Sequence, residues 1–342
     1  MRNIRFAPLS RIAVRLLPFI LASFCGFAVS AYALQCGDNI TTDTTLTADL
    51  GPCPNNGLGI DGIPAHVTLD LNGHTISGSG VGSGVVVGGV SPYGITIKGP
   101  GKIANFNAGL TMGGGASNAL VYDLLLKTNQ TGISINGPNN ASIRILNNVI
   151  DGASAGQVGI TLSDAGGVYF YQNEISGQSV AAVVLQGETS SSVDQNIITL
   201  NQAGILLSAP FLSCSSIHGN QITLNLGNGI QSGRTGGMSS RTQASAITDC
   251  AIQDNTVSWN GGSGIVVFGG MYSPLVQDNM VSHNRNDGIN VIGSDDQGPI
   301  QVVGNRVLHN GTDLSWNGAG VNSCWKQNIF GTSSPQMLPQ CP

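Results

Sequence analysis

One asparagine recurs along residues 147–305 at a nearly constant interval, and this repeat constrains the fold more than any other feature. It stands two residues before an aliphatic side chain, as in Gln172-Asn173-Glu174-Ile175. The asparagines that mark successive repeats are Asn147, Asn173, Asn196, Asn220, Asn255, Asn279 and Asn305. Their intervals are 26, 23, 24, 35, 24 and 26 residues, and Asp123 continues the series 24 residues upstream. A unit of about 24 residues is therefore repeated along the chain.

Further markers run in phase with the first asparagine. Small-aliphatic pairs such as Gly204-Ile205 and Gly264-Ile265 recur once per unit. A second asparagine follows the first by five residues, at Asn201, Asn225, Asn260, Asn284 and Asn310. Between these markers lie short alternating runs separated by Gly, Asn and Ser, with no helical period. The pattern predicts short strands and tight turns.

A repeat of this length predicts one coil of a parallel β-helix, an all-β single-stranded solenoid with three short strands per coil. One coil cannot bury its own apolar face, so neighbouring coils stack about 4.8 Å apart and share a core. Stacked asparagines then form hydrogen bonds along a ladder. A leucine-rich repeat would need a leucine framework, and a propeller blade needs about 40 residues or more. We expect roughly ten to twelve coils, caps included.

The first 33 residues are typical of a signal peptide. Four arginines lie within the first fifteen residues, the apolar segment Leu16–Val29 follows, and Ala31-Tyr32-Ala33 supplies a cleavage site. Fourteen apolar residues are too few to span a membrane. We therefore expect a soluble chain that is secreted or periplasmic after removal of residues 1–33, with no transmembrane segment.

The charge balance disfavours nucleic acid as a partner. Only 9% of residues are charged, and the leader holds four of the 13 basic residues, which leaves nine against 18 acidic ones. Such a chain is repelled by phosphate backbones. We expect a monomer with an N-terminal cap at 34–66, the β-helix at 67–325 and a disulfide-tied tail at 326–342.

Six cysteines remain once Cys25 leaves with the leader, and an even count in an exported chain predicts disulfides. Sequence alone leaves their connectivity open. Nearest-neighbour pairing joins Cys36 to Cys53, Cys214 to Cys250 and Cys324 to Cys341. No CxxC pair or Cys/His cluster indicates a metal site.

The asparagine ladder with its Gly-Ile partner resembles the right-handed parallel β-helix repeats of the pectin-lyase-like superfamily. The stretch Val67–Ile76, VTLDLNGHTI, is similar to the first coil of secreted members. The resemblance covers about residues 36–325 and implies a right-handed solenoid. It implies no single activity, since this scaffold carries lyases, hydrolases, epimerases and proteins without known activity.

Equal offsets from the asparagines at 255, 279 and 305 should place residues of adjacent coils side by side. Four residues after these asparagines stand Trp259, His283 and His309. Eight residues after the last two of them stand Asp287 and Asp313. We expect His283, Arg285, Asp287 and Asp313 to be catalytic: paired carboxylates share a proton or cation, and histidine transfers protons near neutral pH. The alternative is structural, with the histidines half-buried and the aspartates capping turns.

Residues expected to bind substrate surround this group. The 35-residue interval contains a long loop with two arginines, and the coil that starts at Asn279 contains an adjacent acidic pair. Exposed tryptophan faces are natural surfaces for stacking sugars. The expected substrate-binding residues are Arg234, Arg241, Trp259, Asp295, Asp296 and His309. No cofactor is certain, although the acids leave calcium possible.

Two functions remain open on the sequence alone. In the first, the protein is an exported enzyme that binds and processes polysaccharide by lyase, hydrolase or epimerase chemistry. In the second, it is a non-catalytic extracellular module that binds glycan or forms a rigid surface element. Outward-facing, water-accessible His283, Asp287, Asp313 and Arg285 would favour the enzyme, and burial of these groups would favour the module.

Overall fold

The computed structural model describes eleven segments of the chain. Apart from Ala33, all of these residues belong to one compact unit that spans Leu34–Pro342. They are residues 33–61, 66–89, 91–138, 140–153, 155–187, 190–208, 216–232, 251–268, 274–293, 300–318 and 323–342. The leader, the loop arginines Arg234 and Arg241, the pair Asp295-Asp296, and Cys214 and Cys250 lie outside the described residues. Within the described segments every regular element is a strand, and no helix could span a membrane.

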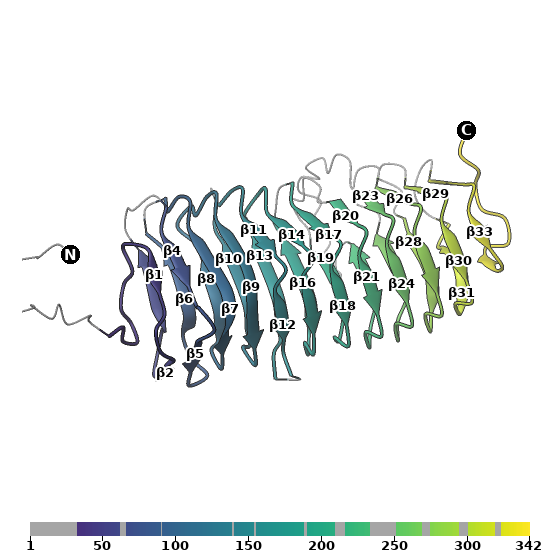
Figure 1. The fold of residues 1–342 in the computed structure, drawn as a ribbon. Helices are drawn as coiled ribbons and strands as arrows, with labels where there is room; N and C mark the ends of the chain where they lie inside the picture. The colour runs from purple at the N-terminus through teal and green to yellow at the C-terminus, as the bar shows by residue number, and fades with distance from the viewer. Residues whose placement is uncertain are drawn as a thin grey trace, which may run out of the picture. The chain divides into compact units, whose positions relative to one another are not determined.

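The strands form three parallel rows that repeat in a fixed order, coil after coil (Figure 1). The long strands β7 (Thr96–Ala104) and β9 (Leu120–Lys127) each contribute to rows 1 and 2. Row 1 otherwise contains β1 (Thr44–Thr45), β4 (Thr68–Asp70), β11 (Arg144–Leu146), β14 (Tyr169–Tyr171), β17 (Ser192–Asp194), β20 (Ser216–His218), β23 (Ala251–Gln253), β26 (Leu275–Gln277), β29 (Gln301–Val303) and β32 (Cys324–Lys326).

Row 2 shares a hydrogen-bonded sheet with row 1, whereas row 3 forms a twelve-stranded sheet of its own. Row 2 otherwise contains β2 (Leu50–Cys53), β5 (Thr75–Gly78), β12 (Val149–Asp151), β15 (Glu174–Ser176), β18 (Ile197–Thr199), β21 (Gln221–Thr223), β24 (Thr256–Ser258), β27 (Met280–Ser282), β30 (Arg306–Leu308) and β33 (Ile329–Phe330). Row 3 contains β3 (Leu58–Asp61), β6 (Ser83–Gly88), β8 (Ala108–Met112), β10 (Thr131–Asn136), β13 (Val158–Ser163), β16 (Ala181–Gln186), β19 (Ile205–Ser208), β22 (Ile230–Ser232), β25 (Ile265–Phe268), β28 (Asp287–Ile292), β31 (Thr312–Trp316) and β34 (Ser333–Ser334). The predicted all-β parallel solenoid with three strands per coil is confirmed.

The core lies between the three rows and is almost wholly aliphatic. A three-residue strand points its middle side chain inward and its two outer side chains toward solvent, because side chains alternate along a strand. Ile145, Phe170, Val193 and Ile217 occupy this middle position in successive row 1 strands, and all are fully buried. Each coil thus extends one continuous apolar column.

Two corners of the coil have the same local structure. A residue with a positive φ, in the left-handed region, is followed by an asparagine whose side chain points inward. At the first corner, between rows 1 and 2, Gln195 has a φ of 53° and Asn196 is buried. At the second corner, between rows 2 and 3, Leu200 has a φ of 59° and Asn201 is buried. The left-handed residue bends the chain from one row into the next, and the asparagine satisfies backbone groups that face the interior.

The asparagines form two hydrogen-bonded ladders. The predicted ladder is confirmed from Asn173 onward but starts at Asn148 instead of Asn147, and the second asparagines of the coils form a ladder of their own. Asn148 Nδ2 donates to Asn173 Oδ1 over 3.0 Å, and the contact repeats to the last rung. The members are Asn148, Asn173, Asn196, Asn220, Asn255, Asn279, Asn305 and Asn328. Asn147 is instead the exposed left-handed residue before the ladder, where it contacts Asp123, which occupies the same place one coil earlier. Of these two adjacent residues, the buried Asn148 joins the ladder and the exposed Asn147 does not.

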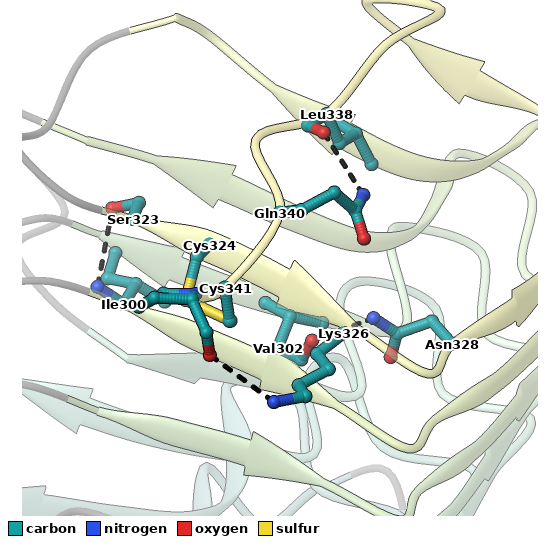
Figure 2. Close-up of a disulfide and its surroundings, with 10 residues drawn as sticks. Ile300, Val302, Ser323, Cys324, Lys326, Asn328, Leu338, Gln340 and Cys341 are labelled. Carbon is teal, nitrogen blue, oxygen red and sulfur yellow. Dashed lines mark hydrogen bonds between the residues drawn. A yellow bond between two sulfur atoms is a disulfide. The ribbon is translucent and has the colours of Figure 1, made fainter.

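Two of the three predicted disulfides lie in the described segments, and both are confirmed. Cys36 joins Cys53 at the N-terminal end, with Cα atoms 5.4 Å apart. Cys324 joins Cys341 with a Cα separation of 4.7 Å and holds the tail on the last coil (Figure 2). Cys341 N–H donates to the carbonyl of Trp325 in β32, so the tail covers part of this strand edge.

Candidate functional site

The second corner brings together three of the predicted site residues on its outer side. Trp259 and His283 stack with ring centroids 4.3 Å apart and an interplanar angle of 10°. His283 and His309 follow at 5.1 Å and 32°. All three have left-handed φ values near 60° and are exposed, so the predicted rung-to-rung neighbourhood of the histidines is confirmed.

The stacking of these rings limits what tryptophan offers to a sugar. The His283 ring covers one face of the Trp259 indole, so a sugar cannot stack on that face. Trp325 is 2% exposed and packs against Trp316 with centroids 5.3 Å apart. Trp325 therefore belongs to the core of the coil that contains β32 and offers no exposed face.

Asp287 opens β28 at a half-buried position on the outer side of row 3. Asn290 Nδ2 donates to its Oδ2 over 2.8 Å, and Thr312 also forms a hydrogen bond with the carboxylate. Burial raises the pKa of Asp287 above its ordinary value of 3.8, against the opposing effect of Thr312. Arg285 is exposed and forms no ion pair with a described residue.

The predicted pairing of Asp287 with Asp313 on adjacent rungs is wrong. Asp287 pairs with Thr312 in the parallel register, because the coil that contains β31 has one residue fewer between its second asparagine and that strand. Asp313 consequently faces inward and is 3% exposed. It acts as a cap for backbone groups, which is the structural alternative that the sequence left open.

A different set of polar groups comes together on the outer face of row 1, and we call Tyr169, Asp194, His218 and Asp254 the row 1 cluster. His218 Nδ1 lies 3.0 Å from Asp194 Oδ1, and His218 Nε2 lies 3.3 Å from Asp254 Oδ2. The Tyr169 hydroxyl donates to Asp194 Oδ2 over 3.2 Å. Four titratable side chains from four consecutive coils therefore share one hydrogen-bonded chain.

Register and corner geometry build this cluster. Asp194 and His218 end β17 and β20 at paired positions, so both side chains leave the same face. Tyr169 begins the neighbouring strand β14, and Asp254 is the left-handed residue of the first corner, with a φ of 55°. The rigid ladder beneath fixes the spacing of all four groups.

The two carboxylates set the proton affinity of the histidine. The hydrogen bond that His218 donates to Asp194 is the largest cause that raises the pKa of His218. Burial is the next largest effect and opposes the rise, and the charges of Asp194 and Asp254 add to it. Burial, followed by the charge of Asp194, raises the pKa of Tyr169. Asp194 is the least exposed carboxylate of the cluster, with a side chain 18% exposed against 56% for Asp254.

His218 and Asp254 are the members of the row 1 cluster that face solvent most, with side chains 42% and 56% exposed. Gly219 occupies the first corner beside His218, where a Cβ would lie 3.3 Å from Gln195 Cγ and 3.6 Å from Asp194 Oδ1. On the other side, Tyr171 stacks on Tyr169 with centroids 5.5 Å apart. Arg144 pairs with Tyr169 in the register and is exposed.

Such an arrangement supplies an acid and a base held by a shared carboxylate. His218 is bound at both ring nitrogens, at Nδ1 by Asp194 and at Nε2 by Asp254, so Nε2 becomes available for proton transfer when the exposed Asp254 moves aside. The described residues contain no group of three or more His, Cys, Asp or Glu side chains placed to hold a metal ion.

The sequence contained a signal for this cluster that equal-offset counting missed. Asp194 and His218 both lie two residues before a ladder asparagine, at Asn196 and Asn220. The offsets compared from sequence covered only the last three coils and did not include this position. Tyr169 is the harder case, because it lies at the opposite end of its strand and reaches Asp194 diagonally.

Comparison with known proteins agrees with the fold. The sequence matches the right handed beta helix region family over residues 72–242 and 131–307, which is more than half of the chain. The chain therefore belongs to this family of right-handed β-helix proteins. No curated protein matches the sequence.

Solved structures with the same architecture share little sequence with this chain. The A-module of the mannuronan C-5 epimerase AlgE4 from Azotobacter vinelandii has a TM-score of 0.53 at 12% identity, over 88% of this chain and 86% of that one. The periplasmic alginate epimerase AlgG has 0.50 at 13%, over 82% and 78%. The Dettilon tailspike protein has 0.51 at 17%, over 78% of this chain but only 55% of the tailspike. At these identities the likeness establishes a shared fold.

Proposed function

We propose that this protein is an exported enzyme that processes an acidic polysaccharide by proton transfer, of the lyase or epimerase type, with the row 1 cluster as its active site. The observation that carries the proposal is the hydrogen-bonded chain from Tyr169 through Asp194 and His218 to Asp254 on an open face. Export is supported by the leader-like residues 1–33 and by two disulfides.

The proposed chemistry starts with the removal of a proton from the sugar carbon beside its carboxylate. Asp254 moves aside, which its exposure allows, and neutral His218 accepts the proton at Nε2 while Asp194 stabilises the imidazolium. In a lyase, the bond to the neighbouring glycosidic oxygen breaks, a carbon–carbon double bond forms, and the Tyr169 hydroxyl protonates the departing oxygen. In an epimerase, Tyr169 returns a proton to the opposite face of the same carbon.

The spacing and charge of row 1 support this class of substrate. Tyr169 and His218 lie two rungs apart, about 10 Å along the stack at the usual strand spacing, with Asp194 on the rung between them. Arg144, one rung beyond Tyr169, offers a guanidinium for a carboxylate of the polymer. Tyr171 and Tyr169 add an aromatic surface beside it.

A competing location for the active site is the group predicted from sequence around His283, Arg285 and Asp287. Exposure of His283 and Arg285 and the raised pKa of Asp287 support it. Against it, His283 stacks between two other rings, and Asp287 bonds to Asn290 and Thr312 in row 3. We therefore place the chemistry in row 1 and use variants of the second-corner group as comparisons.

The test is an assay of the purified chain on a panel of acidic polymers, with and without calcium. Alginate and polymannuronate come first, because alginate and mannuronan epimerases share the fold, and polygalacturonate follows. Ultraviolet absorbance detects unsaturated products, proton NMR detects inverted sugars, and a reducing-end assay detects hydrolysis. We expect unsaturated or inverted products from one polymer, and their loss in Asp194→Asn.

The matched control is Asp278→Asn, a left-handed aspartate in the same corner row as Asp254 but one coil further on. It should retain the activity. If Asp194→Asn is as active as the wild type, the active site lies elsewhere. If no polymer reacts with the wild type but one binds, the protein is the non-catalytic glycan-binding module that the sequence also allowed.

A further inference from the structure

We propose that His283 and His309 form a binding site for a divalent transition metal ion such as Cu²⁺, Ni²⁺ or Zn²⁺, separate from the row 1 cluster. The two imidazoles come from the same place in adjacent coils, with φ values of 57° and 63°. Both side chains are exposed, and neither ring forms a hydrogen bond or ion pair with a described residue. Imidazole is the side chain that these ions favour.

The distance between the rings suits two ligands to one ion. Metal–nitrogen bonds of about 2.0–2.1 Å place two bound imidazole nitrogens at most about 4 Å apart. The ring centroids lie 5.1 Å apart and the planes are already tilted by 32°. A rotation of each ring about its own side chain brings the nitrogens together, and water completes the coordination of an exposed ion.

Trp259 makes the binding step observable. In the structure its indole lies 4.3 Å from the His283 ring at an angle of only 10°. The lone pair of an imidazole nitrogen lies in the ring plane, so His283 has to turn out of its stack on Trp259 to share an ion with His309. The other tryptophans, Trp316 at the end of β31 and Trp325 in β32, pack against each other and are not part of the stack.

Nearby charge makes the site selective for ions that bind imidazole strongly. Arg285 lies two residues after His283, is exposed, and has no ion pair with a described residue. Its charge opposes any cation that is held by charge alone. Calcium and magnesium prefer oxygen ligands, so we expect neither to bind at this pair.

The experiment titrates the full chain with copper, nickel, zinc or calcium chloride alone, and follows tryptophan fluorescence and calorimetric heat. We expect saturable binding of about one Cu²⁺ with quenching of the Trp259 emission, and no response to calcium. His283→Ala and His309→Ala should each weaken binding by about tenfold or more, since even outer-shell changes at metal sites reach that size. Trp259→Phe should keep the binding heat and lose most of the quenching.

The matched control is His66→Ala, because His66 is also an exposed left-handed histidine but has Tyr93 beside it instead of a second histidine. It should bind copper like the wild type. The proposal is overturned if the His283→Ala/His309→Ala double variant binds copper as tightly as the wild type, or if the wild type shows no saturable binding. Neither result depends on whether the chain processes a polysaccharide.

Discussion

Asp313 ends the second asparagine ladder by accepting two hydrogen bonds from Asn310 on one carboxylate oxygen. The backbone N–H of Asn310 donates over 3.0 Å and its Nδ2 over 3.1 Å. In the preceding rungs an asparagine of the next coil supplies this acceptor, as Asn310 does for Asn284. The other oxygen of Asp313 accepts the backbone N–H groups of Gly331 and Thr332 at 2.8 and 3.0 Å. A carboxylate is the one side chain of this size that accepts on both oxygens.

We expect Asp313→Asn to destabilise the fold although the two side chains have nearly the same shape. The amide keeps one acceptor but turns its NH₂ group toward donors, so two N–H groups at this partly buried cap lose their acceptor. The loss in the free energy of unfolding should be about 1–3 kcal/mol. Chemical denaturation at neutral pH measures it. An unchanged unfolding midpoint would show that the cap contributes nothing.

The same carboxylate should make stability fall in acid. Burial raises the pKa of Asp313, but the N–H groups of Asn310, Gly331 and Thr332 outweigh it and hold the pKa below 3.8. Stability from such a group is present above the unfolded pKa and is lost as the pH falls through the folded pKa. The wild type should therefore lose its advantage over Asp313→Asn below about pH 4. This prediction would be contradicted if the difference in the free energy of unfolding between the wild type and Asp313→Asn stayed constant down to the pKa of Asp313 in the folded protein.

Adjacent asparagines give the sharpest test of the first ladder. Asn148→Gln should cost about 1–3 kcal/mol, because the longer side chain cannot keep the contacts to Asn173 and to the carbonyls of Val121 and Leu146. Asn147→Gln should be nearly neutral, since Gln172 holds the equivalent left-handed position one coil on. Melting temperatures of both variants decide the matter. Equal melting temperatures would mean that the buried ladder adds no stability.

The row 1 cluster should stabilise the fold more at low pH than at high pH. His218 has a pKa raised mainly by Asp194, so its contribution is fully present below the unfolded value of 6.5. It is lost as the pH rises through the folded pKa above 6.5. His218→Gln should remove this slope, which unfolding curves between pH 5.5 and 8.5 would reveal. A wild-type slope that persists in the variant must come from another group.

Most of the fold could be predicted from the sequence period, because each coil repeats the same strands and corners. The intervals between asparagines predict the coil length, and the two described disulfides join the cysteines that lie nearest in sequence. The start of the ladder could not be predicted, since Asn147 and Asn148 are both asparagines and only burial separates them. The loop residues Arg234 and Arg241 and the pair Asp295-Asp296 remain predictions.

The site was harder to predict because it depends on register to a single residue. One residue fewer before β31 rotates Asp313 inward and removes it from Asp287, although the counting from Asn279 and Asn305 is correct up to the second asparagine. The stack of His283 on His309 was predictable, since no residue is lost before it. The pairing of Asp194 with His218 was equally predictable, since each lies two residues before a ladder asparagine. The contact of Tyr169 with Asp194 was not, because Tyr169 lies at the opposite end of its strand.

The central claim is that proton transfer takes place in row 1 and not at the second corner. Its most direct test compares kcat/KM of His218→Gln and His283→Gln with the wild type, on the acidic polymer that the wild type converts. The account predicts a loss of about 100-fold or more for His218→Gln and an unchanged value for His283→Gln. Full activity in His218→Gln together with its loss in His283→Gln would contradict the account and place the active site at the second corner.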